Sequence, residues 1–289
     1  MTEIANLYDW LSRYVQLANW IAYRDRFAGF TMHKPLGEGG VQTVNERLLA
    51  IADLPPHPRV LDAGCGFGGT IFAWHARAGG TYDGLTLSRV QTRVASREAK
   101  RRGIDAHFHL RSFDERIDAR YDAIIAIETL IHAPDLAGTV RNLASALVPG
   151  GKLLVVDDMP DGDVPAHDTE LLAQYWSSRA WSIDDFRRAF VHAGLRIDVE
   201  EDLTACVRSR DVATLARVER KYARLYRLAP FAPARAVLSA YIGGIAIERL
   251  YATGVMRYRL FATRSHREPP SDRARSTDAQ STPAYPRAE

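Results

Sequence analysis

A stretch of glycines directly after an apolar segment suggests a loop that could hold a ligand. Residues 60–70 read Val-Leu-Asp-Ala-Gly-Cys-Gly-Phe-Gly-Gly-Thr, and a helix-like segment follows. Glycine lets the backbone approach a ligand closely, because a Cβ would otherwise fill that space. The sequence therefore predicts a ligand-binding turn between a strand and a helix.

The carboxylate two residues before the first glycine helps to distinguish between kinds of ligand. Gly64, Gly66 and Gly69 also fit the G-x-G-x-x-G pattern of dinucleotide-binding loops, so the pattern alone is weak evidence. Asp62 would repel a pyrophosphate but suits a ligand with an ammonium group, such as the amino-acid part of S-adenosylmethionine (SAM). A dinucleotide site also requires an acid at the end of the second strand, where this chain has Thr86. SAM is therefore favoured over a nicotinamide or flavin nucleotide, and a purely structural turn is the remaining alternative.

Strand-like and helix-like segments alternate around this loop. Apolar strands are expected at 59–63, 81–87, 106–110, 121–127 and 152–157, with closing strands at 195–199 and 255–263. Helices are expected at 70–78, 89–103, 136–147 and 182–192. This alternation predicts an α/β fold with a doubly wound, mostly parallel, seven-stranded sheet. In such a sheet, ligands bind outside the carboxyl ends of the strands.

Further segments frame this core. Residues 1–57 are aromatic-rich with helical spacing, end in a Pro-Pro-His-Pro break and are expected to form a helical lid. Residues 58–265 are expected to form the ligand-binding domain, with helical insertions near 159–181 and 205–254. The tail, residues 266–289, has almost no large apolar side chain and is expected to be disordered.

The composition argues against several classes of protein. The 289 residues include 38 Lys and Arg against 35 Asp and Glu, and a net charge of +3 is too balanced to indicate a nucleic-acid partner. Two cysteines supply neither a disulfide scaffold nor a zinc cluster, and no metal site is expected. No secretory signal is visible, and the uncharged stretch 236–247 is shorter than the ~20 residues of a membrane span. We expect a cytoplasmic protein with a small-molecule substrate. Whether it forms a homo-oligomer is left open.

Several segments resemble one enzyme family. Residues 61–69 resemble motif I of the class I SAM-dependent methyltransferases, and residues 147–151, Leu-Val-Pro-Gly-Gly, are similar to their L-x-P-G-G turn. Residues 84–91, Gly-Leu-Thr-Leu-Ser-Arg-Val-Gln, resemble the G-[IV]-T-L-S-x-x-Q segment of the cyclopropane-fatty-acid, tocopherol and sterol methyltransferase branch. Residues 126–135 resemble the A-I-E-A-x-x-H-A-P segment of sterol C-methyltransferases. Glu128 also falls where prenyl-diphosphate C-methyltransferases carry a glutamate.

The resemblance has departures that concern the acceptor. The aromatic N-terminal segment of the sterol enzymes is not reproduced here. Asp157 and Asp158 stand where many of those enzymes have Glu-Trp at the end of the fifth strand. The resemblance therefore leaves the methyl acceptor open.

The resemblance implies SAM as the cofactor and S-adenosylhomocysteine (SAH) as its product. The loop glycines would hold the methionine and ribose part, and polar residues after the second strand would bind ribose and adenine, sandwiched between Leu87 and Phe113. Cys65 is expected to be a small packing residue of the loop, because no motif places a base beside it. The cofactor-binding residues that we expect are Asp62, Gly64, Cys65, Gly66, Thr86, Leu87, Gln91, Ser112, Phe113 and Ile127.

Methylation of a carbon–carbon double bond would leave a carbocation. Such a site needs a negative or aromatic group to stabilise the cation and a base to remove a proton. Glu128 and His132 are the predicted catalytic pair, and they would share a face if their segment were helical. Each also has a structural interpretation, as a helix-terminal acid and a packing histidine. The aromatic lid and insertions favour an apolar acceptor, and we expect Tyr14, His33, Trp176 and Tyr241 to contact it.

These residues support a principal hypothesis and two alternatives. The principal hypothesis is a SAM-dependent C-methyltransferase of an isoprenoid or terpenoid alkene, including a prenyl diphosphate or a sterol-like acceptor. The first alternative is an O- or N-methyltransferase of a small natural product, with His132 as the base. The second is a NAD-dependent oxidoreductase that uses the same glycine loop.

Overall fold

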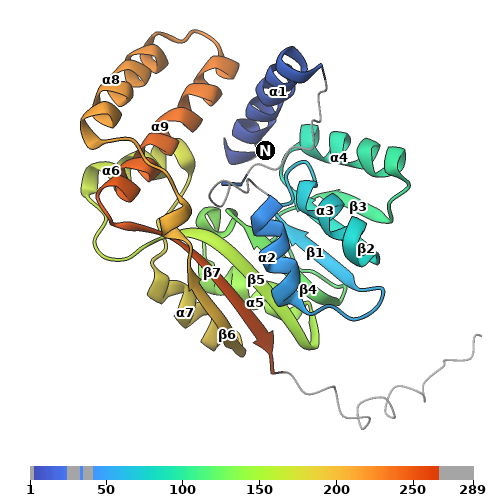
Figure 1. Ribbon diagram of the computed structural model, residues 1–289. Helices are drawn as coiled ribbons and strands as arrows, with labels where there is room; N and C mark the ends of the chain where they lie inside the picture. The colour runs from blue at the N-terminus through green and yellow to red at the C-terminus, as the bar shows by residue number, and fades with distance from the viewer. Residues whose placement is uncertain (1–2, 25–32, 35–41, 267–289) are drawn as a thin grey trace, which may run out of the picture.

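A seven-stranded sheet forms the centre of the computed structural model, which describes residues 3–24, 33–34 and 42–266 (Figure 1). The strand order is β3-β2-β1-β4-β5-β7-β6, and β7 runs antiparallel to both of its neighbours. The order and directions confirm the predicted doubly wound, mostly parallel sheet. The strands are β1 (Arg59–Ala63), β2 (Thr81–Thr86), β3 (Ala106–Leu110), β4 (Tyr121–Ile127), β5 (Leu147–Pro160), β6 (Leu195–Asp202) and β7 (Met256–Ser265).

Helices cover both faces of this sheet and enclose two apolar cores. On one face lie α2 (Gln42–Ala52), α3 (Gly69–Ala78) and α4 (Arg89–Arg102), and on the other lie α5 (Leu136–Ser145) and α7 (Ile183–His192). Successive strand residues point to opposite faces, so Ile124 packs in one core and Ile125 in the other. Strands buried on both faces read as continuous apolar runs, which is why they were visible in the sequence.

The remaining helices form a roof beyond the carboxyl ends of the parallel strands (Figure 1). The roof consists of α1 (Glu3–Tyr23), α6 (Ala166–Leu171), the π-helical turn η3 (Leu172–Trp176), the short 3-10 turn η4 (Thr204–Cys206), α8 (Val212–Leu228) and α9 (Ala232–Ala252). Although α2 belongs to the predicted lid segment, it packs on the sheet, where Leu48 is fully buried. The predicted disordered tail lies, apart from residue 266, outside the described residues. No helix in the described ranges is long and apolar enough to cross a membrane.

Helix α1 is attached to the sheet at two strand ends. The Asp9 carboxylate accepts hydrogen bonds from the Ser88 hydroxyl at 2.5 Å and from the Val90 amide at 3.2 Å, at the start of α4. On the neighbouring side, the Tyr8 hydroxyl lies 2.9 Å from Nε2 of His132, after β4. The helix therefore spans the space between the ends of β2 and β4.

We expect Asp9→Ala to loosen this attachment. The substitution removes an acid from the N-terminus of α4 together with two hydrogen bonds, which should cost about 0.5–2 kcal/mol of unfolding free energy. Urea unfolding and the rate of proteolysis within α1 measure the effect. Arg13→Gln is the matched control on the same helix, since Arg13 stacks on Trp10 at 4.9 Å, a contact within α1. Equal losses in the two variants would contradict the assigned role of Asp9.

Candidate cofactor and acceptor site

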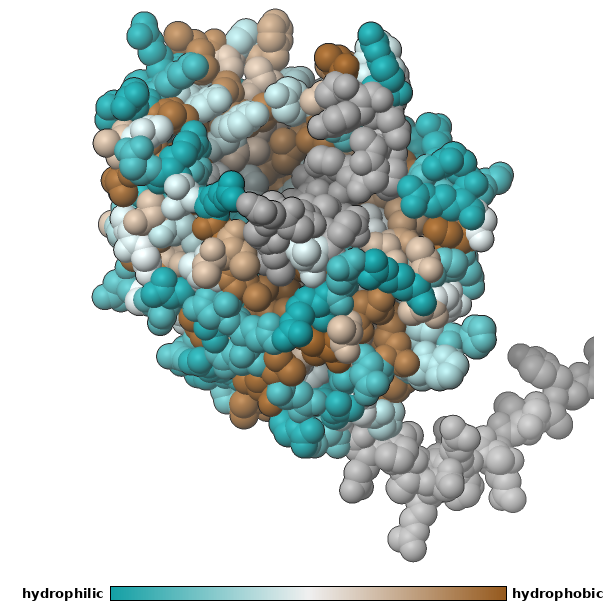
Figure 2. Space-filling view, in the orientation of Figure 1, coloured by the Kyte–Doolittle hydropathy of each residue, from teal (hydrophilic) through white to brown (hydrophobic). Residues whose placement is uncertain are grey.

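A cavity of about 1300 Å³ lies between the roof and the carboxyl ends of the strands. Figure 2 shows the surface hollowed below the tops of α1, α8 and α9. The volume exceeds the ~300–1,000 Å³ of a site for one drug-sized ligand, so the cavity has room for a nucleotide cofactor and a second molecule. Most of the predicted site residues line it: Asp62, Gly64, Cys65, Gly66, Thr86, Leu87, Gln91, Ser112, Phe113, Ile127, Glu128, His132, His33 and Trp176.

The glycine loop is held tightly between β2 and the chain that follows β4. The amides of Gly64 and Cys65 both donate to the Leu85 carbonyl, at 3.0 and 2.9 Å. Gly64 has φ +96°, and a Cβ at this position would lie 2.1 Å from Oγ1 of Thr129. Only glycine fits this turn without a shift in its neighbour, so the backbone here borders the cavity directly.

Asp62 is a buried carboxylate at the edge of that loop. It is 4% exposed, and its carboxylate has no hydrogen-bond partner within the described part of the chain. Burial raises the pKa of Asp62 to about 7. An unpaired buried acid is costly unless a ligand supplies the missing partner. The α-ammonium group of SAM is such a partner, so the residues present fit this cofactor.

The affinity for SAH is therefore expected to rise as pH increases through about 7. Asp62 of the free protein loses its proton in this range, and the ionised carboxylate attracts the ligand's ammonium group. Asp62→Asn should bind SAH more weakly and with a flat profile in calorimetry between about pH 6 and pH 8. His132→Asn serves as the control, because burial lowers the pKa of His132 to about 4 and it does not titrate there. A wild-type affinity that does not change with pH would contradict this prediction.

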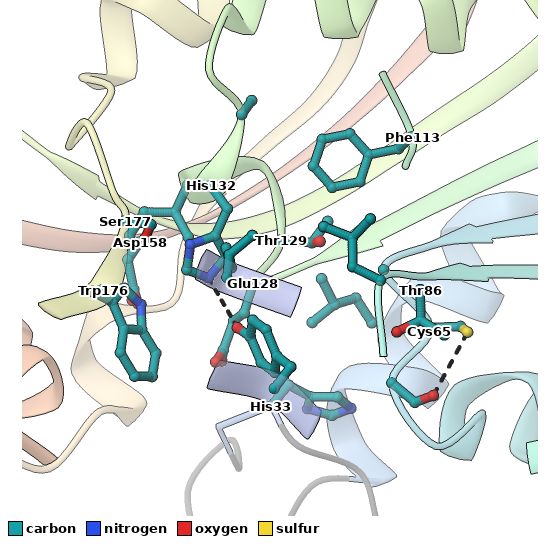
Figure 3. A pocket seen from close by; sticks show the side chains of 18 of the residues that line it. His33, Cys65, Thr86, Phe113, Glu128, Thr129, His132, Asp158, Trp176 and Ser177 are labelled. Carbon is teal, nitrogen blue, oxygen red and sulfur yellow. Dashed lines mark hydrogen bonds between the residues drawn. The ribbon is translucent and has the colours of Figure 1, made fainter. Parts of the chain in front are cut away.

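Neutral side chains occupy the end of β2. The Thr86 hydroxyl donates to Oε1 of Gln91 at 2.6 Å, and the Ser88 hydroxyl caps α4. This arrangement offers hydrogen bonds without the acid that a dinucleotide site places there. Phe113 faces the same space as Thr86 (Figure 3).

The Cys65 thiol is a packing group in this structure. It donates to the Gly66 carbonyl at 3.7 Å and lies so close to Gly84 that a Cβ there would come within 2.8 Å of the sulfur. Burial raises the pKa of the Cys65 thiol well above its usual value. A neutral, enclosed thiol is inert as a nucleophile, in keeping with the expected packing role.

A cluster of charged and phenolic side chains lies across the cavity from the glycine loop. We call Lys34, Glu128, Asp158, Tyr251 and Tyr258 the charged cluster. Lys34 Nζ lies 2.7 Å from Oδ2 of Asp158 and 3.3 Å from Oε2 of Glu128. Oε1 of Glu128 accepts from the Lys34 amide at 2.7 Å and from the Tyr258 hydroxyl at 2.9 Å. The Tyr251 hydroxyl donates to Oδ1 of Asp158.

The backbone at Glu128 is not helical. Glu128 has φ +49°, in the left-handed region, and its amide donates to the Val156 carbonyl at 2.7 Å. Helical structure begins only at the 3-10 turn η2 (Leu130–His132), where Asp157 Oδ2 accepts from the Ile131 amide at 3.1 Å. The condition for a shared helix face is therefore not met, because β-ladder bonding continues through Glu128. The sharp turn still directs both side chains toward the cavity (Figure 3).

His132 is a neutral imidazole paired with a phenol. Its Nε2 lies 2.9 Å from the Tyr8 hydroxyl, and its ring centroid is 5.8 Å from that of Trp176. Burial lowers the pKa of His132 to about 4, so the ring is unprotonated at neutral pH and can accept a proton. Tyr8, the partner of His132, and Lys34 of the charged cluster were not among the predicted site residues.

Two of the expected acceptor contacts lie outside the cavity. Tyr14 and Tyr241 are 44% and 43% exposed, and the Tyr241 ring stacks on Tyr222 with centroids 4.9 Å apart. Helix α1 lines the cavity with Ile4, Tyr8 and Leu11, which follow one another at four- and three-residue steps on one face. Tyr14 is not among the residues that line the cavity. The structure therefore brings His33 and Trp176, but neither of these tyrosines, to the cavity.

Comparison with known proteins places the chain in a family. A model of the methyltransferase domain matches residues 40–200, more than half of the sequence, and the chain belongs to this family. Solved methyltransferases in complex with SAM or SAH share its fold at 18–22% identity. These findings confirm the resemblance of the motif I and strand-end segments to this enzyme class.

Individual relatives show how far the likeness extends. The methyltransferase GfsG of Streptomyces halstedii is 36% identical over 128 residues, which are 43% of this chain and 45% of GfsG. The chain thus spans less than half of the length of this relative. The [4+2]-cyclase SpnF shares the fold with a TM-score of 0.71 at 18% identity, covering 91% of this chain and 95% of SpnF. Geranyl diphosphate C-methyltransferase of Streptomyces coelicolor has a TM-score of 0.66 at 19% identity, covering 89% and 97%.

Proposed function

We propose that this protein transfers a methyl group from SAM to a carbon atom of a small hydrophobic acceptor, with an isoprenoid-type alkene as the favoured class. The observation that carries the proposal is the charged cluster, in which two carboxylates and a tyrosine ring surround an ammonium group at the cavity wall. Surroundings that stabilise an ammonium also stabilise a carbocation. Apolar side chains of the roof, including Ile4, Leu11, Trp176 and Ile247, suit a hydrophobic acceptor.

The proposed roles of the residues follow from where the positive charge moves during the reaction. Bound SAM supplies the methyl group: the alkene π pair forms the new C–C bond, the sulfur keeps the electrons of the broken S–C bond, and the positive charge moves to the acceptor. Glu128 and Asp158 stabilise this charge, and the Glu128 carboxylate takes the proton whose loss restores a double bond. The roof holds the acceptor in line with the donor and excludes water.

The position of the transferred label tests this function. Deuterium-labelled SAM is incubated with a panel of terpenoid alkenes and alcohols, and the products are analysed by mass spectrometry and NMR. We expect the labelled methyl group to be bonded to a carbon atom of the product. A label on oxygen or nitrogen would overturn the carbon assignment and leave methyl transfer itself intact.

O-methylation is the second candidate, and His132 is the observation that favours it. Nε2 of this neutral imidazole already lies 2.9 Å from a hydroxyl, that of Tyr8. An acceptor hydroxyl in the place of the phenol would be positioned for deprotonation. Geranyl diphosphate C-methyltransferase shares the fold at 19% identity, which by itself does not decide between the two chemistries.

A pair of variants is expected to separate the two candidates. If carbon is methylated, Glu128→Gln should lower kcat by about two orders of magnitude or more, and His132→Asn should lower it less. If oxygen is methylated, the order reverses, because His132 then takes the proton. Steady-state kinetics with the acceptor identified above measure both variants, and equal losses would contradict a single-base assignment.

A further inference from the structure

The Lys34 ammonium occupies a cage within the charged cluster. Its Nζ lies 2.7 Å from Asp158, 3.3 Å from Glu128 and 5.1 Å from the centroid of the Tyr258 ring. Asp158 and Tyr258 are buried, whereas the Lys34 side chain keeps an exposed fraction of 26% and lines the cavity. The walls of the cage therefore belong to the protein's interior, and the Lys34 side chain enters the cage from the edge of the cavity.

The cage has the chemistry of a receptor for an organic cation. Carboxylates and an aromatic face around a positive group are the combination that binds quaternary ammonium ligands. Burial alone would lower the pKa of Lys34, but the coulombic attraction of Asp158 and Glu128 outweighs burial and holds this pKa above its usual value. The occupant is thus a full positive charge at neutral pH.

A buried imidazole lies beside the cage. His33, adjacent in the chain, is 9% exposed and lines the same cavity. Its Nδ1 lies 3.2 Å from the Lys34 carbonyl, while its buried Nε2 makes no hydrogen bond of good geometry within the described residues, where Asn45 is its neighbour. An orphaned buried nitrogen at this point suits a ligand that approaches the cage.

We propose that Lys34 is a specificity-determining residue whose ammonium holds the place of the acceptor's positive centre. This inference rests on the proposed function and extends it to a substrate class: acceptors that carry, or acquire on methylation, a positive charge at the cage. The lysine ammonium is strongly hydrated and sits on a flexible four-carbon stem, so it can withdraw toward water. The acceptor's cationic centre then takes its place between Glu128 and Asp158.

The competition between Lys34 and a ligand can be measured without turnover. Hexyltrimethylammonium serves as the cationic probe, and a heptanol that ends in an uncharged tert-butyl group serves as its neutral counterpart. Calorimetry of the SAH-loaded protein compares wild type, Lys34→Gln and Lys34→Arg, and Lys100→Gln provides the matched loss of charge on the exposed end of α4. SAH affinity and the thermal midpoint are recorded for every variant.

We expect Lys34→Gln to bind the cationic probe about tenfold more tightly than wild type, because the competing ammonium is gone. Lys34→Arg and Lys100→Gln should bind it as wild type does, and the neutral alcohol should not distinguish the variants. Unchanged affinity of Lys34→Gln for the cation would overturn the proposal. A loss of SAH affinity in Lys34→Gln would also overturn it, by assigning Lys34 to the cofactor. Failure of methyl transfer to carbon is a separate result, because no step of this experiment requires turnover.

Discussion

Glu128→Gln is expected to lower kcat by about a thousandfold while SAH affinity stays within about twofold of wild type. The amide keeps the shape of the side chain but can neither neutralise a cation nor take a proton. Oε1 of Glu128 accepts hydrogen bonds from the Lys34 amide and the Tyr258 hydroxyl, so the amide oxygen can preserve these contacts. Turnover of labelled SAM with the identified acceptor gives kcat, and calorimetry gives the SAH affinity.

Glu128→Gly separates catalysis from stability at the same position. The left-handed backbone of Glu128, φ +49°, costs an ordinary residue about 1–3 kcal/mol, and glycine adopts it freely. The glycine variant should therefore be inactive and yet lose little stability, since relief of strain offsets the lost ion pair. Thermal unfolding checks the stability. Full activity of Glu128→Gln would remove Glu128 from the catalytic machinery, whatever the stability of the glycine variant.

The central strands were predictable because they are buried on both faces. The segment expected at 106–110 coincides with β3, an edge strand in which only Phe108 is buried, and those at 59–63 and 121–127 coincide with the central strands β1 and β4. Such strands need apolar residues at every position, which the sequence displays directly. The helix expected to run to residue 147 ends at Ser145, because Leu147 already pairs with Tyr121 in the sheet.

The gathering of the expected cofactor-binding residues in one cavity was predictable for a topological reason. Parallel strands bring their carboxyl ends to one edge, so residues after β1, β2 and β4 meet in the cavity. The acceptor half depends on contacts between distant segments. Tyr8, Lys34 and Tyr258 come from α1, the segment after it and the last strand, and no spacing in the sequence relates them. Tyr258 in particular reads as one more large residue of an apolar strand.

The backbone conformation at Glu128 is a feature that the sequence does not reveal. Left-handed conformations of residues other than glycine leave almost no compositional signal, and they concentrate at functional sites. The four-residue spacing of Glu128 and His132 predicts a helical pair, but the β4–β5 ladder takes the Glu128 amide instead. The helical spacing does not apply here, because the amide of Glu128 is bonded within the sheet.

Gly64→Ala is expected to have the largest effect on cofactor binding. The new Cβ would lie 2.1 Å from Oγ1 and 2.7 Å from Cβ of Thr129, on a backbone with φ +96°. The loop must therefore shift away from Thr129, which disturbs the bonds that the Gly64 and Cys65 amides make to the Leu85 carbonyl. We expect SAH affinity to fall by about a hundredfold or more and unfolding free energy to fall by about 3 kcal/mol. Calorimetry and urea unfolding measure the two losses.

Three companion variants distinguish the clash from backbone strain. Gly103→Ala has the same change in a left-handed residue, φ +65°, with no atom within 4 Å of the new Cβ, and should cost only about 1 kcal/mol without affecting SAH. Thr129→Gly in the Gly64→Ala background removes both atoms that collide and should restore part of the stability. Thr129→Ala should not, because the Cβ that remains is still 2.7 Å away. Wild-type SAH affinity in Gly64→Ala would mean that the loop does not hold the cofactor by close backbone approach.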